Sequence, residues 1–386
     1  MKNFVLIFHG YISRGHIDKE LVEIPNGFKN NGFKSSIYYV NEDDFAYKNS
    51  ASIGNEYNGI NIYPIQKKDF FGVNIEIIKY LIKNSRSIEI LTLIHFIKCN
   101  IIYGLIYKLL NPKGKLYIKM DFDPGSHDLK TVFGSKNKYI NKVLYKLVNY
   151  FIKKCDLISV ESKKGYEFLI EYNKQFQKKL EIIPNGINTD KINEIIPKIK
   201  TFEEKENIII TVGRIGTHQK NTEFLLEALS KVDLKDWIVY IIGPIEKDFV
   251  NYTSEYFNKN KNLINRIIFT GPIYDKKELY EYYNKSKIFC LSSRNEGYPI
   301  VSSEALIFGN YIVTSNISSA EDFTDNGKYG KIIEQGNIND YSNEIQRLIN
   351  NNSILMNLNE ELKKYAKKNY EWSNIILKII EKLELK

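Results

Sequence analysis

The feature of this sequence that most constrains its fold is the regular alternation of short apolar runs with longer amphipathic segments. In the first half, apolar runs occur at 4–8, 36–40, 88–94, 115–120 and 156–162. Polar residues or glycine bound each run, and helical patterns separate the runs. Strands that are apolar on both faces and alternate with helices are typical of a parallel sheet covered on both sides. We therefore predict a doubly wound α/β domain.

The alternation begins again after Pro184-Asn185-Gly186. Five more runs are present, at 207–213, 237–243, 266–271, 287–293 and 311–315, separated by helical patterns at 221–232, 275–285 and 300–309. The fold class that we predict is therefore α/β with two Rossmann-like, doubly wound parallel-sheet domains. Ligands of such sheets bind at the carboxyl ends of the strands, so we expect a binding cleft between the two domains.

Charge is distributed unequally between the halves. The 386 residues carry 55 Lys+Arg and 46 Asp+Glu, but residues 1–190 carry 28 basic and 19 acidic side chains and hold the whole excess. The three cysteines form no paired motif, which favours a reducing compartment. The apolar run 4–8 is shorter than the roughly seven residues of a secretory signal core, and no run reaches the ~18 needed to cross a bilayer. We expect a cytoplasmic protein that contacts a membrane only peripherally.

A basic amphipathic segment at 135–155 accounts for much of this charge. Apolar residues recur at helical spacing from Ile140 to Phe151, and six lysines lie among them with no acidic residue: Lys136, Lys138, Lys142, Lys146, Lys153 and Lys154. Such a helix can lie on an anionic membrane surface. A helix packed on the core with a solvated lysine face is the alternative. Nucleic acid is not an expected partner, because we find no recognition motif and the second half is neutral.

Two segments of the second half carry the residues for chemistry. In the first, 211–229, a buried strand ends at Gly213 and Arg214, and a polar loop with Lys220 and Asn221 opens a helix. This order places two cations beside a helix N-terminus, where free amides also favour anions, so we expect a diphosphate to bind there.

The second segment, 292–310, has Glu296 in a Gly/Pro loop and Glu304 inside the following helix. A carboxylate accepts several hydrogen bonds at once, so Glu304 could hold ribose hydroxyls. The amides near Ile300 and Val301 open this helix and could hold phosphate. The eight-residue spacing alone is weak evidence, and the loop and helix around it make it more specific.

Together with IIPNGIN at 182–188, these segments resemble the retaining family-4 glycosyltransferases of the GT-B fold. The family shows a strand-end Gly-Arg with a downstream Lys-Asn, and two glutamates eight residues apart around Glu-Gly-x-Pro. This chain has those residues in the family's order, Gly213, Arg214, Lys220, Asn221, Glu296, Gly297, Pro299 and Glu304. The resemblance is good from about 182 to 330. It implies an acceptor-side domain 1–188, a donor domain 189–365 and a helix at 366–386 that crosses back to the first domain.

The resemblance also implies roles for these residues. Arg214 and Lys220 would neutralise the donor diphosphate, and Glu304 would hold the nucleotide ribose. Glu296, with the amides between Gly297 and Ile300, would contact the transferred sugar. Tyr298, Pro299 and Val301 belong to the same donor-binding segment. The turn with Gly271 and Ile273 would hold the base through backbone groups. The family works without a metal, so we expect no metal ion and no cofactor beyond the nucleotide sugar.

The first half matches the family less well. A glycine turn follows the first strand, and Gly15 is our candidate for approach to the donor; a plain turn glycine is the alternative. Where the family often has a histidine at a strand end, this chain has Asp121, which could orient the acceptor hydroxyl or accept its proton. His95 and His127 are weaker alternatives. Asp121-Phe122-Asp123 also matches the D-x-D metal motif of GT-A glycosyltransferases, which we reject because those enzymes lack the second Rossmann-like half.

The resemblance predicts a retaining hexosyltransferase that uses a nucleotide-diphospho-sugar, with UDP as the expected nucleotide. Its partners would be that donor and a glycan, lipid-linked or glycoprotein acceptor in cell-surface polysaccharide or glycoconjugate synthesis. A nucleotide-sugar epimerase of similar fold and a catalytically silent partner subunit are the two alternatives.

Overall fold

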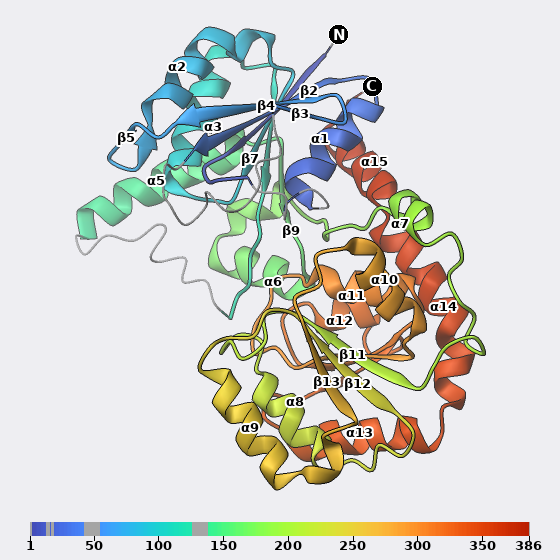
Figure 1. Ribbon diagram of the computed structural model, residues 1–386. Helices are drawn as coiled ribbons and strands as arrows, with labels where there is room; N and C mark the ends of the chain where they lie inside the picture. The colour runs from blue at the N-terminus through green and yellow to red at the C-terminus, as the bar shows by residue number, and fades with distance from the viewer. Residues whose placement is uncertain (1, 13–15, 17–18, 42–54, 126–137, 386) are drawn as a thin grey trace. The chain divides into compact units, whose positions relative to one another are not determined.

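The computed structural model describes residues 2–12, 16, 19–41, 55–125 and 138–385. The chain divides into two compact units (Figure 1). One comprises residues up to Gly186 together with Trp372–Lys386, and the other comprises Ile187–Glu371. The ten predicted strands are present, and the two large sheets are parallel apart from the β3–β4 pair, which confirms the predicted fold class.

The first unit contains an eight-stranded sheet in the order β10-β9-β8-β7-β1-β2-β4-β3. Its pairs are parallel except β3 with β4. The elements are β1 (Asn3–Phe8), α1 (Glu20–Asn30), β2 (Lys34–Asn41), β3 (Glu56–Tyr57), β4 (Ile60–Gln66), β5 (Asp69–Phe70), β6 (Val73–Asn74), α2 (Ile75–Asn84), β7 (Ile90–Ile94), α3 (Lys98–Leu110), β8 (Lys115–Lys119), α5 (Lys138–Lys154), β9 (Leu157–Val160), α6 (Lys163–Tyr172), β10 (Leu180–Ile182) and α15 (Trp372–Lys382).

The strands of this sheet are buried because helices pack on both of its faces. One apolar cluster joins the sheet to α2, α3, α5 and α6, and a second joins it to α1 and α15. The small antiparallel pair β5–β6 stands apart from the main sheet. The sequence patterns did not predict β3 to β6, which are short or, in β4, interrupted by Pro64.

The second unit has a six-stranded parallel sheet in the order β13-β12-β11-β14-β15-β16. Its elements are α7 (Thr189–Ile195), β11 (Ile208–Val212), α8 (Thr222–Leu229), β12 (Ile238–Ile242), α9 (Phe249–Lys259), β13 (Ile267–Gly271), α10 (Lys276–Lys285), β14 (Ile288–Leu291), α11 (Ile300–Ile307), β15 (Tyr311–Ser315), α12 (Ala320–Thr324), β16 (Gly330–Ile333), α13 (Ile338–Asn350) and α14 (Ser353–Tyr370). Helices α8, α9 and α13 cover one face, and α7, α10, α11 and α14 cover the other.

The strand order places β11 and β14 side by side at the centre of this sheet. They are neighbours in space although β12 and β13 lie between them in sequence, so the order of strands reverses direction here. In open α/β sheets such a switch point is where ligands bind, outside the carboxyl ends of the strands. The loops that follow β11 and β14 are the two segments that the sequence analysis singled out.

The C-terminal boundary differs from our prediction. We expected the chain to leave the second domain at 366, but this unit continues to Glu371. The reason is burial, because Ala366 and Tyr370 belong to the apolar core of the second unit and only Trp372 onward packs on the first. Within the part of the chain that is described, no helix combines the length and the apolar character needed to span a membrane.

Candidate nucleotide-sugar site

Two glycines let the ends of β11 and β12 approach closely. The Gly213 amide donates to the Ile242 carbonyl at 3.0 Å. Gly243 has a φ of +143°, and a Cβ on it would lie 1.8 Å from the Gly213 carbonyl oxygen. A Cβ on Gly213 would in turn lie 3.2 Å from Cε of Lys220. The turn after β12 therefore requires glycine at position 243, and the Lys220 side chain passes directly over Gly213 in the loop after β11.

A tight turn orients Lys220. The amides of Lys220 and Asn221 both donate to the Thr217 carbonyl, each at 3.1 Å. Asn221 then adopts a left-handed conformation, with φ 51° and ψ 47°, immediately before α8 begins. Asparagine tolerates this conformation better than most residues, which explains its place at the start of this helix.

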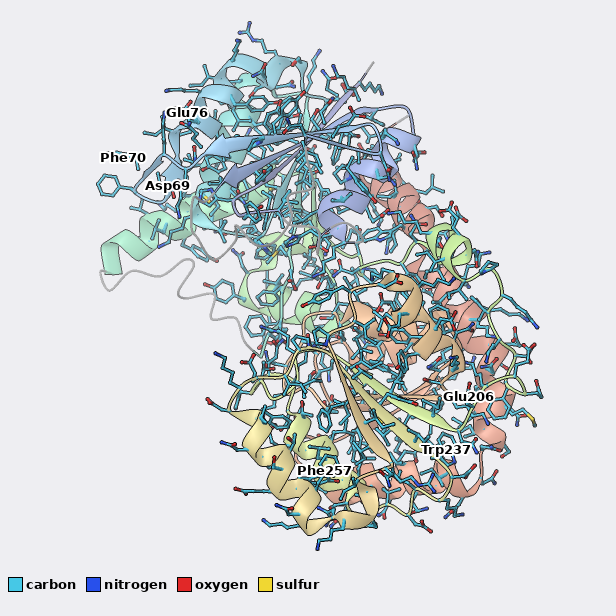
Figure 2. All side chains as sticks on the ribbon, viewed as in Figure 1. Asp69, Phe70, Glu76, Glu206, Trp237 and Phe257 are labelled. Carbon is cyan, nitrogen blue, oxygen red and sulfur yellow. The ribbon has the colours of Figure 1, made fainter. Side chains whose placement is uncertain are left out.

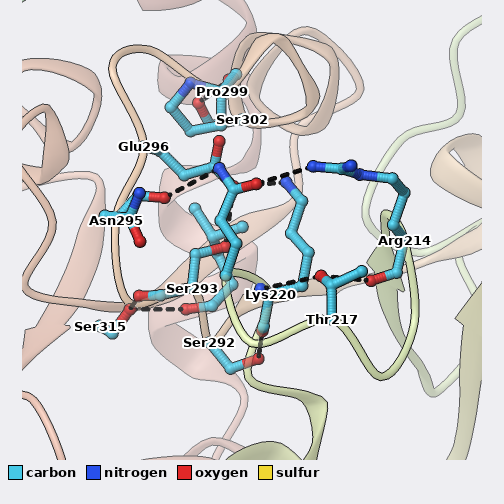
Figure 3. Close-up of polar contacts among 12 residues, drawn as sticks. Arg214, Thr217, Lys220, Ser292, Ser293, Asn295, Glu296, Pro299, Ser302 and Ser315 are labelled. Atoms are coloured by element: carbon cyan, nitrogen blue, oxygen red, sulfur yellow. Dashed lines mark hydrogen bonds and ion pairs between the residues drawn. The ribbon is translucent and has the colours of Figure 1, made fainter. Parts of the chain in front are cut away.

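The Lys220 side chain reaches Glu296, in the loop after β14, and the two form an ion pair (Figure 3). Their side chains are 17% and 12% exposed, so the pair is shielded but open to solvent on one side. The same Glu296 carboxylate oxygen accepts from the Ser293 hydroxyl at 3.0 Å, and the Ser318 hydroxyl donates to the Glu296 carbonyl at 2.6 Å. Two contacts to the carboxylate and one to the main-chain carbonyl thus hold Glu296 in one orientation.

Gln219 joins the two loops and was not among the predicted residues. Its carbonyl accepts from the Arg294 amide at 2.8 Å, and its Nε2 donates to the Asn295 carbonyl at 3.1 Å. Its Oε1 accepts from Nη2 of Arg214 at 2.8 Å, so the exposed guanidinium is held beside Lys220. The sequence indicated this role of Gln219 only by a polar residue directly before Lys220, and glutamines in loops are too common for that to be informative.

Glu304 lies on α11 and is oriented by two partners from α10. Tyr283 donates to its Oε2 at 3.1 Å, and Lys276 lies 3.3 Å from its Oε1. Its side chain is 8% exposed. Burial raises the pKa of Tyr283 well above its ordinary value, and the Glu304 carboxylate adds to this effect. The tyrosine therefore stays protonated and donates, which leaves other lone pairs of the carboxylate for a ligand.

The N-terminus of α11 presents backbone amides to the same edge of the sheet. Pro299 precedes Ile300, and no side-chain hydrogen bond caps this end. The Ser302 hydroxyl turns inward to the Pro299 carbonyl at 2.6 Å. Tyr298 is buried in the core, so its backbone rather than its ring is the group near the loop. The amides of Gly297, Ile300 and Val301 remain candidates for an anion.

The turn after β13 differs in one respect from our expectation. Gly271 has a φ of +75°, but its carbonyl accepts from the Gly243 amide at 3.0 Å and from the Thr270 hydroxyl at 2.9 Å. Both lone pairs of that oxygen are therefore used within the protein. Any backbone acceptor for a base would have to come from the residues that follow, such as Ile273, which is only partly buried.

The predicted residues of the first half belong to the other unit. Asp121 is exposed and lies two residues beyond the end of β8, not at the strand end as predicted. Lys119, the last residue of β8, turns its side chain into the interior, where its Nζ lies 2.5 Å from a carboxylate oxygen of Glu161, and both side chains are 1% exposed. Burial raises the pKa of Glu161 to about 8, and Asp121 adds to the effect while Lys119 opposes it.

Two histidines follow strands of the same sheet. His95 follows β7 with a φ of +70°, and its amide donates to the Lys119 carbonyl at 2.7 Å. His9, which follows β1, lies 3.9 Å from Asp69 and was not among the candidates. Gly15 and His127 lie outside the described residues. Within the residues that are described, no group of three or more His, Cys, Asp or Glu could hold a metal ion.

Comparison with known proteins gives these loops a context. Residues 192–369 match the family model described as glycosyl transferases group 1. An uncharacterized glycosyltransferase of Methanocaldococcus jannaschii, MJ1069, is 28% identical over 297 residues, which cover 74% of this chain and 72% of that protein. A Campylobacter jejuni enzyme is 25% identical over 68% of each chain; it is named N-acetylgalactosamine-N,N'-diacetylbacillosaminyl-diphospho-undecaprenol 4-alpha-N-acetylgalactosaminyltransferase.

Alignments with the first three curated relatives cover 72%, 49% and 52% of those proteins' own lengths. Among solved structures, Anabaena Alr3699/HepE in complex with UDP superposes with a TM-score of 0.73 at 15% identity, over 100% of both chains. That likeness establishes the shared fold.

Proposed function

We propose that this chain, whose residues 192–369 match the glycosyl transferases group 1 family model, transfers a sugar from a nucleotide-diphospho-sugar to an acceptor hydroxyl with retention of anomeric configuration. The observation that carries this proposal is the Lys220–Glu296 pair, which brings a cation and a carboxylate together at the switch point of the second sheet. UDP is the nucleotide that we propose, and HepE was solved with UDP.

The positive charges of the site are suited to a reaction in which a nucleoside diphosphate is the leaving group. As the bond from the anomeric carbon to the diphosphate oxygen breaks, negative charge develops on that oxygen. The Lys220 ammonium, the Arg214 guanidinium and the α11 amides would bind this charge without having to reorganise. Diphosphate and Glu296 would then compete for Lys220, which frees the Glu296 carboxylate to accept hydrogen bonds from sugar hydroxyls.

Glu304 completes the proposed donor site, and Asp121 is the residue that we propose for the acceptor. Glu304 would accept from the ribose hydroxyls, since Tyr283 and Lys276 hold its carboxylate in place. On the first unit, Asp121 would orient the acceptor hydroxyl or accept its proton. We propose no metal ion and no further cofactor, since lysine, arginine and amides would supply the positive charge.

We propose a glycan, lipid-linked or glycoprotein acceptor in cell-surface polysaccharide or glycoconjugate synthesis. The Campylobacter relative acts, by its name, on a diphospho-undecaprenol-linked sugar. Helix α5 supports a membrane setting, because Lys142, Lys146, Lys153 and Lys154 are exposed on it beside exposed Val143 and Tyr150. Its other side packs on the core through Val148 and Phe151. We propose that this basic surface contacts an anionic membrane from the cytoplasmic side.

The test of the donor site compares the wild type with Lys220→Met on UDP-, GDP- and ADP-sugars, with and without EDTA. We expect release of nucleoside diphosphate from one donor, resistant to EDTA, and a loss of at least ~30-fold in kcat/KM in the variant, or about 2 kcal/mol of transition-state stabilisation. Lys231→Met, an exposed lysine just beyond the far end of α8, is the control and should keep the wild-type rate.

Product analysis tests the remaining parts of the proposal. NMR of the transferred sugar should show the donor's anomeric configuration. Inversion would contradict retention, and EDTA-sensitive turnover would contradict the metal-free site. Equal rates for Lys220→Met and the wild type would remove Lys220 from the mechanism.

A further inference from the structure

The hairpin β5–β6 exposes two phenylalanines at its tip. Phe70 is 63% exposed and Phe71 is 93% exposed, and their rings pack edge to face on each other, with centroids 4.6 Å apart. Figure 2 shows Phe70 pointing away from the body of its unit. Phenylalanine is usually buried, and an exposed pair leaves a large apolar area in water. Exposed apolar groups of this kind often mark a contact surface.

The backbone at this tip is strained. The loop of the hairpin consists of Phe71 and Gly72, both with positive φ, at +52° and +76°. A two-residue loop of this kind favours asparagine or aspartate at the first position, because a bulky side chain there is disfavoured. Phe71 therefore costs stability twice, through its conformation and through its exposure. Neither cost is offset by a contact with the core, which points to a function outside the unit.

The base of the hairpin is held rigidly. Asn74 is fully buried, and its amide donates to the Tyr103 hydroxyl at 2.7 Å. Its side chain donates to the Gln66 carbonyl at 2.9 Å and accepts from the Glu76 amide at 2.9 Å, so that one residue anchors the hairpin and begins α2. The two phenylalanines are thus presented on a fixed support, which lowers the entropy lost when they bind.

The charge around the hairpin indicates what they bind. Lys67 and Lys68 directly precede it, and α3 packs both against β6 and against α5, on which Lys142, Lys146, Lys153 and Lys154 are exposed. Residues 1–190 carry 28 basic and 19 acidic side chains, so a second copy of this surface would be repelled. An anionic lipid surface is attracted by the lysines and offers an apolar phase for the rings.

We propose that Phe70 and Phe71 insert into the boundary between headgroups and acyl chains of an anionic bilayer, while the lysines of this unit bind the headgroups. This inference rests on the membrane contact in the proposed function and is independent of the donor chemistry. Phenylalanine is one of the apolar residues that surface-bound segments bury at that depth of a bilayer. Stable attachment without a spanning helix needs two such contributions, here an apolar one and an electrostatic one.

The first test uses Phe71→Asn, which places in the turn a residue that the turn favours. Cosedimentation is measured with vesicles of about 30% phosphatidylserine in phosphatidylcholine, because anionic lipid supplies the negative surface potential that attracts lysines. We expect binding to fall about tenfold or more, as for loss of one buried aromatic ring, while the melting temperature stays equal or rises. Leu109→Asn is the control: Leu109 is 79% exposed and lies six residues beyond Tyr103 on α3, so its loss should leave binding unchanged.

The second test measures insertion directly with Phe71→Trp. The two native tryptophans, Trp237 and Trp372, are 2% and 3% exposed, so a new indole at the tip would report separately. We expect its emission to shift to the blue with anionic vesicles and to be quenched by lipids brominated on the acyl chain. The proposal is overturned if the wild type does not bind the vesicles, or if Phe71→Asn binds them as well as the wild type does. It is also overturned if Leu109→Asn loses as much binding as Phe71→Asn, or if the new indole is not quenched.

The donor chemistry is measured separately, as release of nucleoside diphosphate in the absence of vesicles. Phe71→Asn should leave that release unchanged. If vesicle binding behaves as expected and no donor is turned over, the donor proposal fails and the insertion stands. If release proceeds but the tip does not insert, only the insertion fails.

Discussion

Gly243 shows how strongly a single residue can constrain this site. A Cβ there would lie 1.8 Å from the Gly213 carbonyl oxygen, which is backbone and cannot rotate away as a flexible side chain could. We predict that Gly243→Ala separates the ends of β11 and β12, displaces the loop that carries Lys220 and lowers nucleotide affinity by at least tenfold. We also expect a loss of roughly 3 kcal/mol in the free energy of unfolding. Calorimetric titration with UDP and urea denaturation measure the two effects.

Gly336→Ala is the matched control in the same unit. Gly336 also has a positive φ, +77°, but a Cβ there would meet no atom within 4 Å. This substitution incurs only the conformational cost, about 1 kcal/mol, and should leave UDP binding unchanged. Equal loss of affinity in the two variants would mean that backbone strain, and not the contact with Gly213, is responsible.

At the scale of an element, the end of α10 depends on a buried lysine that the sequence analysis did not single out. Lys205 is 5% exposed, and its Nζ lies 2.6–3.3 Å from four oxygens of Tyr283, Asn284, Ser286 and Asn310. Three of these are main-chain carbonyls at the C-terminus of α10, where orphan acceptors and the helix dipole favour a cation. Lys205 therefore attaches the segment before β11 to the helix that carries Tyr283.

Stability should depend on pH through this lysine. Burial and the positive charges of Lys363, Lys200 and Lys287 lower the pKa of Lys205 well below 10.5. The folded chain then binds fewer protons than the unfolded chain. The contribution of Lys205 to the free energy of unfolding therefore grows as pH rises toward 10.5 and shrinks as pH falls. We expect Lys205→Met to lower the free energy of unfolding by about 2–3 kcal/mol at pH 9 and by less at pH 6.

Urea denaturation at both pH values, followed by Trp237 fluorescence in a Trp372→Phe background, measures this difference. Trp237 lies in a core of the same unit. The exposed Lys247→Met serves as the control and should change stability by no more than about 0.5 kcal/mol at either pH. If Lys205→Met lowered the free energy of unfolding more at pH 6 than at pH 9, the lowered pKa of Lys205 would be contradicted.

At the scale of the whole molecule, the last helix completes the core of the first unit. Helix α15 packs on α1, and Ile376 fits where Gly27 has no side chain, since a Cβ there would lie 2.2 Å from Cγ1 of Ile376. Ile376 is 1% exposed and the adjacent Leu377 is 56% exposed. We predict that Ile376→Ala lowers the free energy of unfolding of the first unit by about 2–5 kcal/mol, because it leaves a cavity between two helices.

Trp372 belongs to the same apolar cluster, so its fluorescence in a Trp237→Phe background reports on this unit during urea denaturation. Leu377→Ala provides the matched comparison, with an expected change of at most about 0.5 kcal/mol. Similar losses for the two neighbours would indicate a general effect on the helix, and no loss for Ile376→Ala would show that α15 is dispensable to the core.

Local patterns in the sequence predicted much of the fold. Apolar runs of five to seven residues coincide with β1, β2, β7 to β9 and β11 to β15, because strands buried on both faces have no polar face to obscure them. The two loops with Lys220 and Glu296 were also found from sequence, because a cation at a strand end and a glutamate before Gly-x-Pro keep fixed positions along the chain.

The tertiary structure decided which of these residues meet and which supports hold them. Lys220 and Glu296 are 76 residues apart and pair only because β11 lies beside β14. The carbonyl oxygen of Gly271, in β13, accepts from the Gly243 amide just after β12, and Lys119, in β8, turns inward to Glu161 just after β9. Propensity and periodicity act over a few residues, whereas these contacts depend on strand order and on closure of the core. The sequence by itself therefore determined the elements and the residue types of the site, and the packing of parallel strands determined their geometry.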